Sequence, residues 1–180
     1  TQTSALFYGG APGSPGVATT ESWNGSSWTE VGDLNTAREG LGGAGTQPSA
    51  IAYGGRTAPS SFSALAESWN GSAWTEVGDL NTARYSFASA GVDNEAALGF
   101  GGYNGSRQSI NESWNGSSWT ELADMNTARW LLGGTGTSTS AIGFGGDDPS
   151  DAVANTESWN GSSWTEVNDL NTARYHLPGV

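Results

Sequence analysis

The chain has 180 residues and a mass of 18.5 kDa, a length that suits one or two domains. Its formal net charge of −12 arises from 18 acidic residues against 6 basic ones, which argues against binding to nucleic-acid backbones or anionic membranes. Cysteine is absent and only one histidine is present, so the sequence excludes a disulfide framework, a thiolate metal site and most acid–base machinery.

An internal repeat dominates the sequence. An 18-residue segment occurs four times, and 14 of its 18 positions are identical in all copies. The copies span residues 21–38, 67–84, 112–129 and 157–174. Their spacing of about 45 residues divides residues 1–180 into four units, which we expect to form a single domain.

Each unit begins with an alternating segment that ends in a glycine pair. The first is SALFYGG (4–10), in which Leu6 and Tyr8 stand two residues apart. The same pattern returns at residues 49–55, 96–102 and 140–146. A period of two places both apolar side chains on one face, so the segment predicts a β-strand that the glycines end.

The 18-residue segment predicts a β-hairpin. In the first copy TTESW leads into Asn24-Gly25, and SSWTEV returns. Asn-Gly tolerates the positive φ angles of a tight hairpin turn. Trp23 and Trp28 flank this turn, and we expect Trp28 to be a core residue. The turns also match glycosylation sequons, as do two further sites, but turn chemistry explains Asn-Gly without a glycan. The sequon asparagines are Asn24, Asn70, Asn104, Asn111, Asn115 and Asn160.

A polar turn, Asp-Leu-Asn-Thr-Ala-Arg or a close variant, precedes a strand of small residues. These strands span residues 39–45, 85–91 and 130–136, with YHLPGV (175–180) at the end of the chain. Four short strands per unit, with no helical periodicity, predict an all-β propeller with four blades per chain. We expect the small-residue strand to lie innermost and the C-terminal strand to complete the N-terminal blade, which would hide two sheet edges.

The repeat resembles the Kelch repeat. The features that carry the likeness are Gly9–Gly10 and the later Trp23 and Trp28, which recur in register in all four units. The resemblance implies four-stranded Kelch-like blades. Kelch propellers usually contain more than four blades, so a four-bladed monomer and a homodimer forming an eight-bladed ring both remain open. A looser resemblance to tandem repeats of phage and environmental proteins favours a secreted or viral-surface location.

Candidate binding residues lie where the repeats differ. The loops between the second and third strands (11–20, 56–66, 103–111 and 147–156) vary, and such loops often carry function. The start of the inner strand varies too, and in a Kelch-like blade it shares a face with these loops. The candidates are Glu39, Tyr85, Trp130 and Tyr175 from the inner strands and Arg56, Tyr103, Arg107 and Asp147 from the loops. Their rings and charges could hold a sugar, or the rings could pack between blades.

Charges shared by all repeats are better explained by the scaffold. Glu21, Glu30, Asp33 and Arg38 recur in each unit, which favours a structural Arg–carboxylate contact and an Asp-capped turn. Asp147, Asp148 and Asp151 could bind Ca²⁺ through oxygen ligands, but their spacing differs from that of an EF-hand loop and favours an exposed acidic loop.

The sequence therefore predicts a non-catalytic module without metal or cofactor. It would recognise a protein or glycan through one propeller face. Two alternatives remain open: a multivalent lectin with a sugar site in each blade, and a purely structural repeat, natural or designed, with no ligand.

Overall fold

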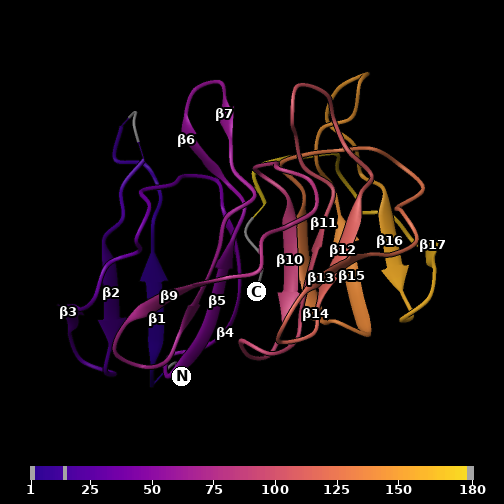
Figure 1. The fold of residues 1–180 in the computed structure, drawn as a ribbon. Helices are drawn as coiled ribbons and strands as arrows, with labels where there is room; N and C mark the ends of the chain where they lie inside the picture. The colour runs from indigo at the N-terminus through magenta and orange to yellow at the C-terminus, as the bar shows by residue number, and fades with distance from the viewer. Residues whose placement is uncertain (1–2, 14–15, 178–180) are drawn as a thin grey trace.

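The computed structural model describes residues 3–13 and 16–177 and shows an all-β protein (Figure 1). These residues contain no helix, and hence none long and apolar enough to cross a membrane. The first sheet has the strand order β1 (Ala5–Tyr8), β2 (Thr20–Trp23), β3 (Trp28–Glu30). The second has the order β4 (Gly42–Thr46), β5 (Ser49–Tyr53), β8 (Ala66–Trp69), β9 (Trp74–Val77).

The last two large sheets repeat the second. The third sheet has the order β10 (Ala88–Gly91), β11 (Ala97–Phe100), β12 (Asn111–Trp114), β13 (Trp119–Glu121). The fourth has the order β14 (Gly133–Thr137), β15 (Ser140–Phe144), β16 (Thr156–Trp159), β17 (Trp164–Val167). All pairings are antiparallel. A separate hairpin, β6 (Arg56–Ala58) and β7 (Ser61–Phe62), projects from the second sheet.

The predicted Asn-Gly hairpin is confirmed in each repeat. Asn70 Oδ1, for example, accepts hydrogen bonds from the backbone N–H groups of Ser72 and Ala73 at 3.0 Å each. Gly71 takes a φ of 94°, which a residue with a Cβ rarely adopts. The turn fixes the register, so the two tryptophans of each repeat lie directly opposite each other.

The sheets pack through their small-residue strands and their tryptophans. Strand β10 packs between β4 and β14, where glycine and alanine allow close approach. Further out, Trp119 of the third sheet lies 4.6 Å from Tyr53 of the second, measured between ring centroids. The prediction that Trp28 is a core residue is wrong. Its side chain is 49 % exposed, because no sheet covers that side of the first sheet in the described residues, whereas Trp119 is 6 % exposed.

One tryptophan contact differs between repeats in a way that predicts a stabilising substitution. Trp74 Nε1 donates to Thr20 Oγ1 at 3.0 Å, but Ala66 occupies the equivalent of Thr20 beside Trp119. In the described part of the chain, Trp119 Nε1 is buried without a hydrogen-bond partner. We expect Ala66→Thr to raise the free energy of unfolding by about 1 kcal/mol, measured by urea denaturation. A loss of stability would mean that the added atoms do not fit.

The charged residues that recur in every repeat form the Arg–carboxylate contact that the sequence suggested. In the structure this contact joins neighbouring sheets. Arg38 pairs with Glu67 of the second sheet at 2.7 Å, and both side chains are buried. Burial lowers the pKa of Arg38, and the charge of Glu67 opposes that shift. Asp33 acts as the predicted turn residue, since its Oδ1 accepts from the backbone N–H of Thr20 at 3.1 Å.

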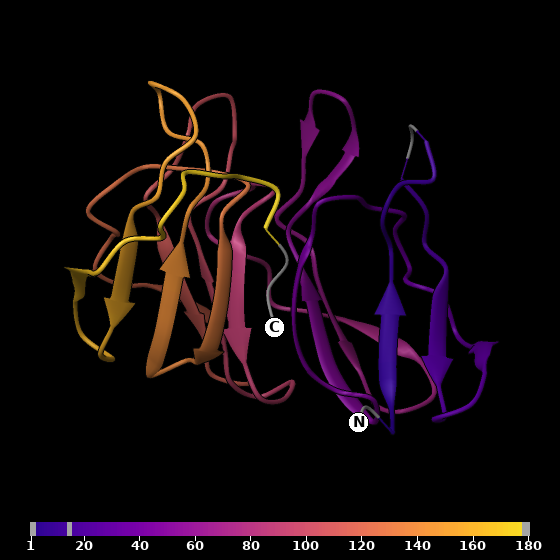
Figure 2. The same ribbon diagram turned by 180° about the vertical axis from the view of Figure 1, so that it is seen from behind.

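Two features of the predicted ring differ in the structure. The first sheet has three strands instead of four, and Tyr175–Leu177 form no strand; residues 178–180 of the expected closing strand lie outside the described residues. The large sheets also do not close on one another in the described part, and Figure 2 shows the first and fourth sheets on opposite sides of the molecule. Without an inner strand, the first sheet lacks the element through which the others pack.

Candidate functional site

A chain of backbone hydrogen bonds aligns the starts of the inner segments. Ser86 N–H donates to the carbonyl of Gly40, Leu131 N–H to that of Ser86, and His176 N–H to that of Leu131, at 2.8–2.9 Å. All four residues have φ between 52° and 59°. For the three with side chains this is a costly conformation of the kind found at binding sites. These bonds hold the residues that come just before them in a fixed order around one end of the molecule. Those residues are Glu39, Tyr85, Trp130 and Tyr175.

Three of these preceding residues, Tyr85, Trp130 and Tyr175, border a cavity of about 400 Å³. Its volume lies in the range of small-molecule sites. The charged and aromatic side chains that line it are Arg56, Tyr85, Trp130, Asp147, Asp151, Tyr175 and His176. They come from the inner-segment starts and from the loops after β5 and β15, which lie at the same ends of their strands.

An aromatic cluster forms one wall of the cavity. The Trp130 ring lies 5.7 Å from Tyr85 in an edge-to-face arrangement and 4.9 Å from Tyr103. Phe62, on the β6–β7 hairpin, stacks on Tyr85 at 5.7 Å. Such pairs hold one another rigid, so the cluster presents ring faces and edges that are already in place for a ligand.

Two ion pairs support these rings. Arg56 Nε lies 2.7 Å from Glu39 Oε1, and its guanidinium stands 4.5 Å from the centre of the Tyr85 ring. Partial burial raises the pKa of Tyr85 and the charge of Arg56 opposes that shift, so near neutral pH the phenol remains a hydrogen-bond donor.

The second pair joins two loops. Arg107 Nη2 lies 2.7 Å from Asp147 Oδ2, which also accepts a hydrogen bond from Trp130 Nε1. Asp147 therefore fixes the orientation of the indole while remaining on the cavity wall.

The structure brings the sequence-based candidates together. Arg56, Tyr85, Trp130, Asp147 and Tyr175 line the cavity. Glu39, Tyr103 and Arg107 lie behind them as ion-pair and ring partners.

Sequence reasoning missed Phe62, which stacks on Tyr85, and the lining residues Ser86, Leu131 and His176. The available signal for Phe62 was that it is the one aromatic residue in the variable loop of residues 56–66.

The carboxylates of the acidic loop, Asp147, Asp148 and Asp151, are already engaged in contacts with other groups of the protein. Asp148 Oδ1 accepts hydrogen bonds from the backbone N–H and hydroxyl of Ser150, which lower the pKa of Asp148. Asp147 is held by Arg107, and the third carboxylate, Asp151, accepts from the Ala152 N–H at 2.8 Å. The loop thus uses its oxygens to hold its own shape.

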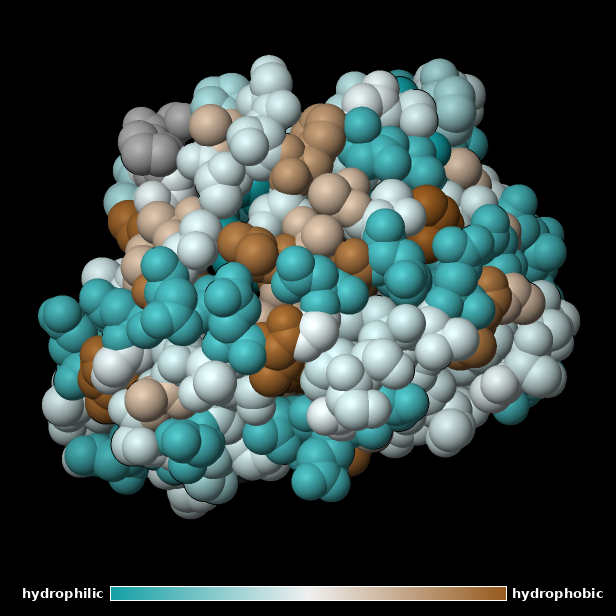
Figure 3. Space-filling model, viewed as in Figure 1, coloured by the Kyte–Doolittle hydropathy of each residue, from teal (hydrophilic) through white to brown (hydrophobic). Residues whose placement is uncertain are grey.

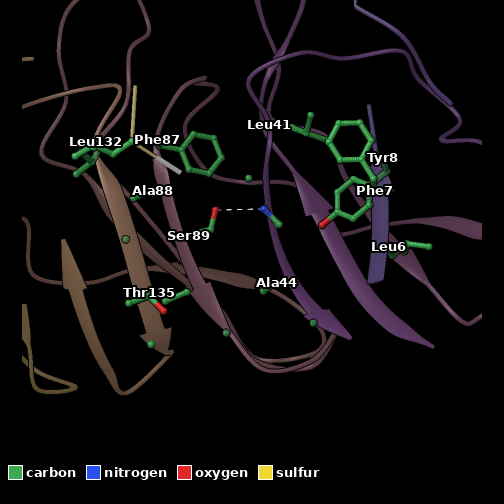
Figure 4. Close-up of a pocket in the computed structure, with 18 residues that line it drawn as sticks. Leu6, Phe7, Tyr8, Leu41, Ala44, Phe87, Ala88, Ser89, Leu132 and Thr135 are labelled. Atoms are coloured by element: carbon green, nitrogen blue, oxygen red, sulfur yellow. Dashed lines mark hydrogen bonds between the residues drawn. The ribbon is translucent and has the colours of Figure 1, made fainter. Parts of the chain in front are cut away.

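A second cavity of about 490 Å³ lies among the inner strands (Figure 4). Its walls come from β1, β4, β10 and β14 and consist mainly of glycine, alanine and leucine. Figure 4 draws one hydrogen bond between lining residues: the backbone N–H of Gly43 donates to Ser89 Oγ at 3.2 Å. This lining offers few groups that could distinguish ligands, so we take the aromatic cavity as the candidate site.

The outer surface offers no competing apolar patch on the side seen in Figure 3, where apolar residues are scattered among polar ones. Comparison with known proteins adds no further constraint: no family model matches the chain, and a search of curated proteins finds no significant match.

Proposed function

We propose that the chain is a non-catalytic binding module, built from four Kelch-like propeller blades, which recognises a glycan through the aromatic cavity. The observation that carries this proposal is the convergence of Tyr85, Trp130 and Tyr175 with two ion-paired side chains on one cavity of about 400 Å³. A sugar ring has C–H groups on its faces and hydroxyls around its rim. Aromatic side chains can pack on the former, and Arg56 and Asp147 can hydrogen-bond to the latter.

Binding is better supported than catalysis by the state of the carboxylates. Glu39 and Asp147 are each paired with a guanidinium, and Asp147 also accepts from the Trp130 indole, so both carboxylates already hold other side chains of the site in place. A single site per chain is also better supported than a repeated one, because Glu39, Tyr85, Trp130 and Tyr175 stand at equivalent positions but differ chemically.

The test is titration calorimetry of the full chain with a panel of monosaccharides and short oligosaccharides. We expect a bound sugar at one site per chain, and Trp130→Ala should weaken it about tenfold or more, a loss of about 1.4 kcal/mol. Val92→Ala, an exposed apolar change in the turn between β10 and β11, is the matched control and should leave the affinity unchanged. Four sites per chain would favour the repeated lectin, and a panel without binding would contradict glycan recognition.

A further inference from the structure

The contact between consecutive sheets is built from one repeated set of side chains. Buried Arg–Glu pairs join the first sheet to the second, the second to the third and the third to the fourth. The pairs are Arg38–Glu67, Arg84–Glu112 and Arg129–Glu157. Each glutamate also accepts two bonds of 2.7–2.8 Å from an asparagine of the preceding repeat, one from its backbone and one from its side chain.

The residues that would form a fourth contact of this kind are also present, but they lie at opposite ends of the row of four sheets. Glu21 is exposed on the first sheet, and Arg174 and Asn171 are exposed beyond the fourth. Within residues 3–13 and 16–177, neither Glu21 nor Arg174 forms an ion pair. The Arg174 Nε reaches only the backbone carbonyl of Thr172, at 3.3 Å. One end therefore carries an available carboxylate and the other an available guanidinium.

The aromatic residues of this missing contact are likewise split between the first and the fourth sheet. In the three formed contacts a tryptophan packs 4.6–4.8 Å from an aromatic ring of the preceding sheet. These pairs are Tyr8–Trp74, Tyr53–Trp119 and Phe100–Trp164. The matching residues of the fourth set are Trp28, 49 % exposed, and the half-buried Phe144. We call the surface of Glu21, Trp28 and Phe7 the Glu21 face, and that of Arg174, Asn171 and Phe144 the Arg174 face.

The side chain of Phe7 favours a contact between separate chains. Its equivalents in the other sheets are Ala52, Gly99 and Gly143. A Cβ added to Gly99 or Gly143 would lie 3.0 or 2.8 Å from a ring atom of the preceding sheet, so this position is tightly enclosed in the formed contacts. Phe7 is 59 % exposed and too large for the same spacing. Closing one chain on itself requires the fourth contact to match the other three, whereas separate chains can adjust their spacing.

We propose that the Glu21 face of one chain binds the Arg174 face of a second copy, and that two such contacts close a ring of two chains. Head-to-tail contacts of this kind form closed rings when the rotation completes a turn. Each contact would bury an Arg–Glu pair together with the Trp28 and Phe144 rings. Because each chain carries a charge of −12, the ring should form best at physiological ionic strength, where distant repulsion is screened.

The first measurement is the solution mass of the 180-residue chain by light scattering at about 0.15 M salt. We expect twice 18.5 kDa, about 37 kDa. A mass of 18.5 kDa at all concentrations, or any mass other than that of two chains, would overturn the proposal.

The decisive measurement uses charge-reversal variants at the two faces. Glu21→Arg alone and Arg174→Glu alone each place like charges in both contacts, so each variant should run at 18.5 kDa. Mixing the two variants pairs opposite charges at both contacts again and should restore about 37 kDa. A chain that closes on itself gains nothing from mixing.

The control is Glu95→Arg, the same charge change at an exposed turn between β10 and β11, which should leave the mass of the ring unchanged. Circular dichroism of each variant checks that it is folded, as expected for substitutions at exposed positions. A two-chain mass that persists in both single variants would place the contact elsewhere and overturn the proposal.

Discussion

Glu112→Ala should lower the free energy of unfolding by about 3–5 kcal/mol, because it leaves the guanidinium of Arg84 buried without its counter-charge. Both side chains of this pair are fully buried. Glu112 also accepts hydrogen bonds from the backbone and side-chain N–H groups of Asn81, which would lose their partner. Urea denaturation followed by tryptophan fluorescence gives the change, which is large against the usual total of about 5–15 kcal/mol.

The matched control is Glu121→Ala. Glu121 lies directly opposite Glu112 in the β12–β13 pairing but is exposed, so its loss should change stability by about 0.5 kcal/mol or less. A double variant, Arg84→Met with Glu112→Leu, should recover much of the loss because it removes both buried charges together. A cost of Glu112→Ala equal to that of Glu121→Ala would show that the pair contributes little to the contact between sheets.

The fold could be predicted as far as local patterns determine it. Alternation such as Leu6 and Tyr8 gives the second strand of each unit, and Asn-Gly gives the hairpin. The recurring arginine indicated an Arg–carboxylate contact, but not that Arg38 reaches Glu67 in the next sheet. That pairing depends on how neighbouring sheets pack together, and the sequence pattern within one repeat does not reveal that packing.

The candidate site was predictable because it occupies the positions where nearly identical repeats differ. Tyr85 and Trp130 stood out against a constant background, and the alignment of inner segments brings them together. Phe62 was missed because the β6–β7 hairpin closes over Pro59 and Ser60 without an Asn-Gly signal. The wrong expectation for Trp28 has a similar cause: the tryptophans of the repeats have the same local sequence, and only the neighbouring sheet decides which one is buried.

The tryptophan at this repeat position gives the second large effect. Trp119→Ala should cost about 3–5 kcal/mol, since the indole is 6 % exposed and packs against Tyr53 and Trp114 in the core. Thermal or urea unfolding measures the loss. A cost below about 1 kcal/mol would mean that the core collapses into the space left by the ring.

Trp28→Ala removes the same side chain from the same local sequence and serves as the comparison. In an isolated chain its cost should be well below that of Trp119→Ala, because the Trp28 ring is half in solvent. If the Glu21 and Arg174 faces join two copies, Trp28 becomes buried against Phe144 of the second copy, and Trp28→Ala should weaken the two-chain assembly.

These two effects separate on dilution. At low concentration, where chains are single, Trp28→Ala should have only the small cost expected for a half-exposed ring. At high concentration its cost should be larger, because the unaltered chain gains more stability from assembly than the variant does. A Trp28→Ala cost that is as large as that of Trp119→Ala and independent of concentration would instead show that the first sheet is covered within a single chain.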